Sequence, residues 1–137
     1  MQPAFTFPVR VYYEDTDSGG VVYYANYLKY MERARTEWLR ALGFEQDELL
    51  ERHGVLFAVR SAQMEFLKPA KFNDALQVTV VLDRCRHASI IVHQQVLCEN
   101  ALLCEAEVKV ACIEAETFTP CAMPEALAAR LTSGGAA

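Results

Sequence analysis

The chain has 137 residues and a mass of 15.4 kDa, which is the size of one ordinary domain. Its hydrophobic content of 53% and charged content of 23% are typical of a globular protein and exclude an intrinsically disordered one. The length also excludes catalytic scaffolds that need a large parallel sheet, such as a TIM barrel. Any chemistry must therefore fit a small scaffold or be assembled from several copies of it.

The formal net charge is −5, from 13 Lys and Arg against 18 Asp and Glu. No long basic stripe is present to neutralise phosphates, so we expect no nucleic-acid partner. A small anionic ligand held by a few local cations remains compatible with this charge.

The cysteines are odd in number and never spaced as C-x-x-C, which excludes a zinc ribbon and a thioredoxin-like motif. They are Cys85, Cys98, Cys104, Cys112 and Cys121. We expect reduced thiols in a reducing compartment. The first residues show no signal-peptide pattern, and no stretch approaches 18 uninterrupted apolar residues. The sequence thus predicts a cytoplasmic protein without a membrane span.

The first half of the chain predicts one strand and one long helix. Residues 5–13 alternate and are rich in Phe, Val and Tyr, as in a strand. Residues 25–42 carry an apolar stripe at helical spacing, formed by Tyr27, Met31, Ala34, Trp38 and Ala41 and widened by Leu28 and Leu42. Arg33 and Glu37 form an expected i,i+4 ion pair on its polar side. Gly43 ends this helix, and Gly54 stops a short second helix at residues 46–52.

The second half predicts four strands, at residues 55–68, 75–84, 88–98 and 102–113, with turn residues between them. A terminal helical turn is expected at residues 124–131 and a frayed tail at 132–137. This order predicts a single α+β domain over residues 1–131, with an antiparallel sheet packed against one central helix. Such an open sheet has long edges that need cover or a partner.

The densest functional signal is the stretch at residues 15–27, DTDSGGVVYYANY. It joins carboxylates, a glycine turn and the start of the long helix, where backbone N–H groups lack partners. Such donors can hold the oxyanion that forms when a carbonyl is attacked. A carboxylate upstream can then act as nucleophile or as the base that activates water. The alternative, that Asp15 and Asp17 only cap turns, is the commoner role for such residues.

Two other interpretations fit this stretch poorly. A D-x-D phosphatase loop would need a parallel α/β sheet, which the predicted strand order does not offer. A calcium loop would need Glu at its twelfth position, where this sequence has Asn26.

Two segments carry a family resemblance. Residues 12–23 (YYEDTDSGGVVY), continued by 30–37 (YMERARTE), and residues 64–74 (MEFLKPAKFND) resemble the 4-hydroxybenzoyl-CoA thioesterase family of the hot-dog-fold superfamily. Within that family they are most similar to the Tol–Pal-associated acyl-CoA thioesterases. The resemblance implies a hot-dog fold, in which the antiparallel sheet wraps around the long helix.

The resemblance also implies site residues and an activity. Asp17 matches the catalytic acid, as nucleophile or base, and the Tyr24 backbone N–H matches the donor that polarises the thioester carbonyl. Asp15 is expected to support the turn. The subgroup often has His where Tyr24 stands, so the sequence leaves the preferred acyl group open. The implied activity is hydrolysis of an acyl- or aroyl-CoA thioester, without a metal or a redox cofactor.

The resemblance further implies a homodimer or homotetramer with active sites between subunits. Tyr23 and Asn26 are candidates for the acyl pocket. Cations that flank the predicted turns are candidates for the phosphates of coenzyme A, namely Lys68, Lys71, Arg84 and Arg86. Two alternatives stay open: a thioesterase that acts on acyl carrier protein thioesters, and a non-catalytic module that binds acyl-CoA.

Overall fold

The computed structural model describes residues 4–133. Its elements follow the order expected from the sequence: β1 (Phe5–Arg10), a short 3-10 turn η1 (Tyr13–Asp15), α1 (Ala25–Ala41), α2 (Gln46–His53), β2 (Val55–Phe66), β3 (Ala75–Cys85), β4 (Ser89–Cys98), β5 (Ala101–Glu114) and α3 (Glu125–Thr132).

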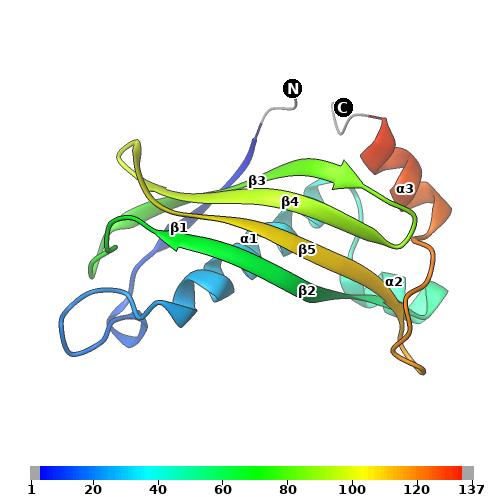
Figure 1. Cartoon of the computed structure of the whole chain (residues 1–137), viewed down its shortest axis with the longest axis horizontal. Helices are drawn as coiled ribbons and strands as arrows, with labels where there is room; N and C mark the ends of the chain where they lie inside the picture. The colour runs from blue at the N-terminus through cyan, green and yellow to red at the C-terminus, as the bar shows by residue number, and fades with distance from the viewer. Residues whose placement is uncertain (1–3, 134–137) are drawn as a thin grey trace.

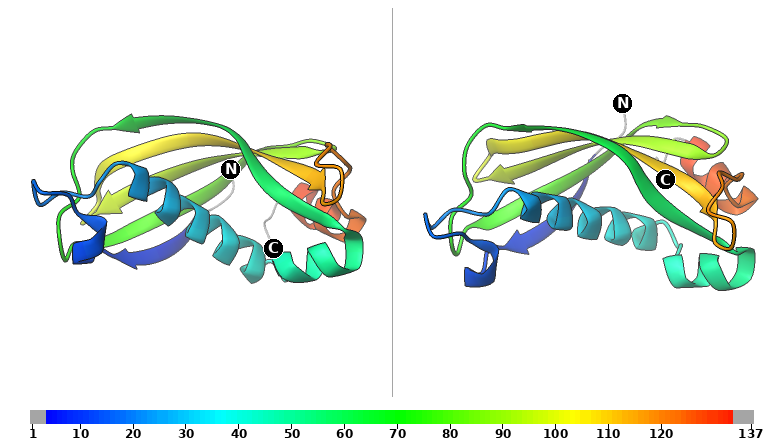
Figure 2. Two further views of the ribbon diagram at one scale, coloured as in Figure 1. Left: turned by 90° about the horizontal axis from the view of Figure 1, so that it is seen from below. Right: turned by 60° about the horizontal axis from the view of Figure 1, so that its bottom comes forward.

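The five strands form one antiparallel sheet in the order β1-β3-β4-β5-β2. The sheet is strongly twisted and curls over α1, which lies along its concave side (Figures 1 and 2). This is the α+β arrangement that the sequence predicts. β1 and β2 are the two edge strands, and β2 pairs only with β5 among the described residues.

The apolar face of α1 makes the core with the inner residues of the sheet. Four residues of the predicted stripe are buried: Tyr27, Met31, Ala34 and Trp38. Ala41 is exposed and Leu28 is 45% exposed, so those two assignments were wrong. At 3.6 residues per turn the stripe passes from Trp38 to Leu42, which packs against the core in place of Ala41.

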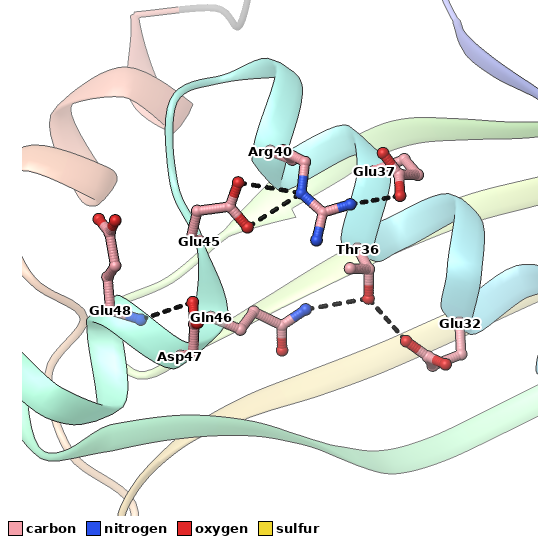
Figure 3. Close-up of polar contacts among 8 residues, drawn as sticks. All are labelled: Glu32, Thr36, Glu37, Arg40, Glu45, Gln46, Asp47 and Glu48. Atoms are coloured by element: carbon pink, nitrogen blue, oxygen red, sulfur yellow. Dashed lines mark hydrogen bonds and ion pairs between the residues drawn. The ribbon is translucent and has the colours of Figure 1, made fainter.

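The end of α1 is tied to the start of α2 by side chains (Figure 3). Arg40 Nε donates to Glu45 at 2.9 Å, and its Nη1 pairs with Glu37. The predicted pairing of Glu37 with Arg33 is therefore wrong, because Glu37 reaches Arg40, which lies beside the next helix. Gly43 follows α1 with φ of +100°, the left-handed conformation expected of a residue that ends a helix.

Other boundaries differ slightly from expectation. The first strand ends at Arg10 rather than at residue 13, because the chain leaves the sheet to form the 3-10 turn at Tyr13–Asp15. The predicted tail began at residue 132, but Thr132 is the last residue of α3. Residues 134–137 of that tail lie outside the described residues.

All five cysteines are free thiols. Burial raises the pKa of Cys104 and of Cys112 to about 12, with the neighbouring Cys121 adding to the effect at Cys112. These two thiols remain protonated at neutral pH and are poor nucleophiles. No helix within residues 4–133 is both long and apolar enough to cross a membrane.

Two adjacent leucines of α2 test the packing of this helix. Leu49 is 5% exposed, whereas Leu50 is 45% exposed. We expect Leu49→Ala to lower the free energy of unfolding by about 2–4 kcal/mol, since it removes buried methylene groups and leaves a cavity. Leu50→Ala, the matched control with the same change in helix propensity, should cost less than about 1 kcal/mol. Urea denaturation measures both, and equal losses would contradict the placement of α2.

Candidate active site

The loop before α1 is closed by backbone hydrogen bonds. Thr16 and Val22 form an isolated antiparallel bridge, and the Asp17 N–H donates to the Val21 carbonyl at 2.9 Å. The Gly20 N–H donates back to the Asp17 carbonyl at 3.0 Å, with Gly20 at φ of +80°. Only glycine adopts that conformation without strain, so the turn depends on this residue.

The Asp17 carboxylate stands at the tip of this loop and is exposed. Its Oδ1 accepts the Gly19 N–H at 2.8 Å. A Cβ at position 19 would lie 3.2 Å from that oxygen, so glycine allows this close approach. Within residues 4–133 no donor bonds to Oδ2 of Asp17. One carboxylate oxygen is therefore held in place while the other is available to a ligand or to water.

Asp15 fastens the loop to the helix. Its carbonyl accepts the Tyr23 N–H at 2.9 Å and the Asn26 side-chain amide at 2.8 Å, and its Oδ2 accepts the Tyr12 N–H at 2.8 Å. This is the supporting role expected of Asp15. Asn26 is 8% exposed, and its amide holds the loop.

The first turn of α1 offers a free donor. Tyr24 has helical dihedral angles, φ −57° and ψ −30°, and no side chain caps this end of the helix. In the described part of the chain the Tyr24 N–H has no acceptor. It lies at the positive end of the helix dipole, where a developing negative charge is stabilised.

A hollow of about 270 Å³ lies beside this donor. It is lined by Val22, Tyr24, Tyr27, Phe66, Leu67, Lys68 and Pro69. The Phe66 ring lies 6.0 Å from that of Tyr24 and 5.7 Å from that of Tyr27. The Tyr27 hydroxyl accepts the Ala70 N–H at 3.0 Å, which joins α1 to the segment after β2. The result is a mainly apolar wall with three aromatic rings and one lysine.

Two further tyrosines border the loop. Tyr23 is 48% exposed, and the neighbouring Tyr24 raises the pKa of its hydroxyl. Tyr30 is 1% exposed and its hydroxyl has no partner among the described residues. Burial raises the pKa of Tyr30, and the nearby Asp15 carboxylate raises it further. The Tyr30 hydroxyl is therefore neutral beneath the loop.

The predicted cations fall into two groups. Lys68 lines the hollow, and Lys71 pairs through its backbone with Val21 of the loop. Arg84 lies near the far end of β3 and Arg86 just beyond it, about 30 Å from Ala75 at the start of the strand, because a strand rises about 3.3 Å per residue. Within one chain the structure therefore brings the two lysines to the loop and leaves the two arginines far from it.

The chain resembles known proteins over most of its length. The sequence pattern of the thioesterase-like superfamily matches residues 11–131. The acyl-CoA thioesterase YbgC of Haemophilus influenzae is 45% identical over 121 residues, which cover 88% of this chain and 89% of that protein. The acyl-CoA thioester hydrolase YbgC of Escherichia coli O6:H1 is 44% identical over 126 residues, 91% of this chain and 93% of that protein.

The chain belongs to the thioesterase-like superfamily. The solved structure of a probable thioesterase from Bartonella henselae matches with a TM-score of 0.84 and 34% identity, and the match covers 89% of this chain and all of that one. The expected hot-dog fold is confirmed by this match and by the antiparallel sheet around α1.

Some residues of this thioesterase-like site carried no local signal in the sequence. Phe66 ends a strand 39 residues after Tyr27, and only the fold brings their rings together. Arg35 lies outside this site but did carry a signal, because it is one turn from Met31 and from Trp38 and so interrupts the apolar stripe with a cation.

The hydrogen bond from the Asn26 side-chain amide to the Asp15 carbonyl can be tested by mutation. In Asn26→Asp the side chain can no longer donate to the Asp15 carbonyl and places a carboxylate beside it. We expect the Tyr23 amide, which donates to the same carbonyl, to exchange its hydrogen about tenfold faster or more. Hydrogen exchange by NMR measures this rate. Asn100→Asp in the β4–β5 turn is the matched control, and an unchanged Tyr23 rate in Asn26→Asp would refute the fastening role.

Proposed function

We propose that this protein is a thioesterase that hydrolyses acyl- or aroyl-CoA to the free acid and coenzyme A. One observation carries the proposal. The Tyr24 N–H at the start of α1 has no acceptor in the described chain, and the preceding loop carries the Asp17 carboxylate, of which only Oδ1 is hydrogen-bonded. The relatives named as acyl-CoA thioesterases, at 44–45% identity, support the same activity.

In the proposed reaction the thioester carbonyl oxygen accepts the Tyr24 N–H, which stabilises the oxyanion as the carbonyl carbon is attacked. Two routes to that attack fit the carboxylate. Asp17 Oδ2 removes a proton from water while the hydroxide adds to the carbonyl carbon, or Oδ2 adds itself and water then cleaves the resulting anhydride. In both routes the carbon–sulfur bond breaks, the thiolate takes up a proton, and the acid is released.

We assign the neighbouring cations to the coenzyme. Lys68 borders the hollow and Lys71 follows it, so their ammonium groups can meet phosphate oxygens at its mouth. Asn26 positions the loop, and Tyr23 presents its ring at the surface beside Tyr24. The five free thiols fit a reducing compartment, so we propose the cytoplasm as the location.

Replacement of Asp17 tests the chemistry. We expect Asp17→Asn to lower kcat about 10²–10⁴-fold on a panel of acyl- and aroyl-CoA thioesters, because an amide neither adds to the carbonyl nor accepts the proton. Thiol release measures the rate. Glu14→Gln is the matched control, an exposed acid of the adjacent 3-10 turn, and should retain the wild-type rate.

Three outcomes are informative. Full activity in Asp17→Asn would refute the mechanism. Saturable acyl-CoA binding without any thiol release in the wild type would instead identify a non-catalytic binding module. A much higher kcat/KM on acyl carrier protein thioesters than on the matching CoA thioesters would identify the carrier protein as the partner.

We also propose that two copies pair along β2. This edge strand has no neighbour on its outer side among the described residues, and its inner side chains Val59 and Phe66 are each 50% exposed. A second β2 running antiparallel would satisfy the open backbone groups and cover these apolar residues. In this antiparallel pairing the start of β2 in one copy would lie opposite the end of β2 in the other copy. That end carries Phe66, which lines the hollow. The active site would then lie between subunits.

Light scattering tests this assembly. We expect a mass of two or four times 15.4 kDa for the wild type. Ala62→Glu places a charge on the exposed inner side of β2 and should yield monomers with reduced kcat/KM. Thr6→Glu on the opposite edge strand is the control and should leave the mass unchanged. A fully active monomer would overturn the interfacial site.

A further inference from the structure

A second cavity lies away from the Asp17 loop, between the second half of α1 and the strands. Its volume is about 120 Å³. Its apolar lining is Trp38, Leu39, Phe57, Val59, Ile90 and Val110. An apolar cavity of about 150 Å³ is known to hold a benzene molecule, so this somewhat smaller one has room for an apolar body of at most about that size.

Arg35 brings a positive charge to the wall of this cavity. Its Nη1 donates to Gln94 Oε1 at 2.8 Å. Gln94 is fully buried in β4 and donates from Nε2 to the Met31 carbonyl at 3.1 Å and to the Thr79 carbonyl at 3.3 Å. These bonds use both N–H groups of the amide, orient its oxygen and fix the guanidinium in place. Its other N–H groups have no acceptor within residues 4–133.

The Arg35 guanidinium also lacks a counter-ion. No carboxylate of residues 4–133 lies within 4.0 Å of it. The exposed Arg40, one turn and a half further along α1, has two carboxylate partners (Figure 3). Burial lowers the pKa of Arg35, and the charge of Glu32 only partly opposes this effect. An arginine stays protonated in proteins, so a partly buried cation remains without an anion among the described residues, which is costly.

The Glu32 carboxylate, whose charge acts on Arg35, bonds to a different side chain. Glu32 Oε2 accepts the Thr36 hydroxyl at 2.6 Å, and that hydroxyl oxygen accepts the Gln46 side-chain amide at 3.0 Å (Figure 3). These three polar residues also line the cavity, and their chain of hydrogen bonds ties α2 to α1. Glu32 thus lies near Arg35 without pairing with it, and within residues 4–133 the guanidinium is open to an anion that enters the cavity.

We propose that this cavity binds a small carboxylate, with an apolar body no larger than about a benzene ring packed among the cavity's apolar residues and its carboxylate paired with Arg35. The planar guanidinium suits a carboxylate because two parallel N–H groups can donate to its two oxygens. The cavity begins seven residues into α1, about 10 Å or more from the helix start that carries the Tyr24 donor. The bound carboxylate is thus distinct from the carbonyl attacked by Asp17 of the same chain.

Titration of the full-length protein with benzoate tests this site. The chain has one tryptophan, Trp38, and it lines the cavity, so its fluorescence reports occupancy. We expect a saturable change with benzoate and at least about tenfold weaker binding of benzamide, which has the same shape without the charge. A charged hydrogen bond of about 1.5–3 kcal/mol corresponds to a factor of about 10–150 in affinity.

Substitution of the arginine provides the second arm. Arg35→Met should weaken benzoate binding about tenfold or more, and Arg35→Lys should restore part of it, since the charge returns without the planar pair of donors. Arg52→Met, which removes an exposed cation from α2, is the matched control and should bind as the wild type does. Should Arg35→Met fail to fold, the comparison of benzoate with benzamide in the wild type still decides the question.

The carboxylate could belong to a free acid or to the far end of an acyl group. Glutaryl-CoA and butyryl-CoA, which differ by a terminal carboxylate, separate these sources. A rise in KM for glutaryl-CoA alone in Arg35→Met identifies the acyl group, and unchanged KM values with weakened benzoate binding identify a free acid. Equal affinity for benzoate and benzamide, or no saturation by about 50 mM benzoate, would overturn the proposal. This result is independent of the Asp17→Asn test.

Discussion

The burial of one face of α1 against the concave side of the sheet is the constraint on which the rest of the structure depends. Tyr30, Met31 and Ala34 are at most 1% exposed, and the helix that carries them packs against β1 and β3. Burial of this much apolar surface on both partners is the dominant favourable contribution to folding. Because the helix is held along its length, the position of its first turn is also determined, and with it the direction in which the Tyr24 N–H is offered.

The loop with Asp17 takes its place from the same packing. Asp15, Tyr23 and Asn26 join the loop to the first turn of the helix through one shared carbonyl. The second fastening runs from Val22 and Tyr27 to Ala70, which follows β2. The Asp17 carboxylate is thus exposed at the tip of a loop that is hydrogen-bonded both to α1 and to the segment after β2. Such a tip suits a group that must meet a substrate in a constant geometry.

The same core contains polar groups that local packing does not require. Gln94 lies fully buried among aliphatic residues, yet its hydrogen bonds to Met31 and Thr79 satisfy its amide. Arg35 depends on Gln94 for its position and has no anion near it in the described chain. A satisfied buried amide costs little, whereas a desolvated unpaired cation costs a great deal. By this contrast we interpret Gln94 as a structural residue and Arg35 as the residue proposed to bind an anion.

The sequence alone predicted most of the secondary structure and the fold of this protein. The helical spacing of Tyr27, Met31, Ala34 and Trp38 and the glycines after α1 and α2 predicted these elements to within a few residues, because such signals are local. The family motif around Asp17 predicted the hot-dog fold. Only the tertiary structure decided that Leu28 is exposed, that Arg84 and Arg86 lie far from the loop, and that Arg35 faces a cavity with no carboxylate partner among residues 4–133. Each of these depends on which distant residues share one space, and the periodicity of a single segment carries no information about its neighbours.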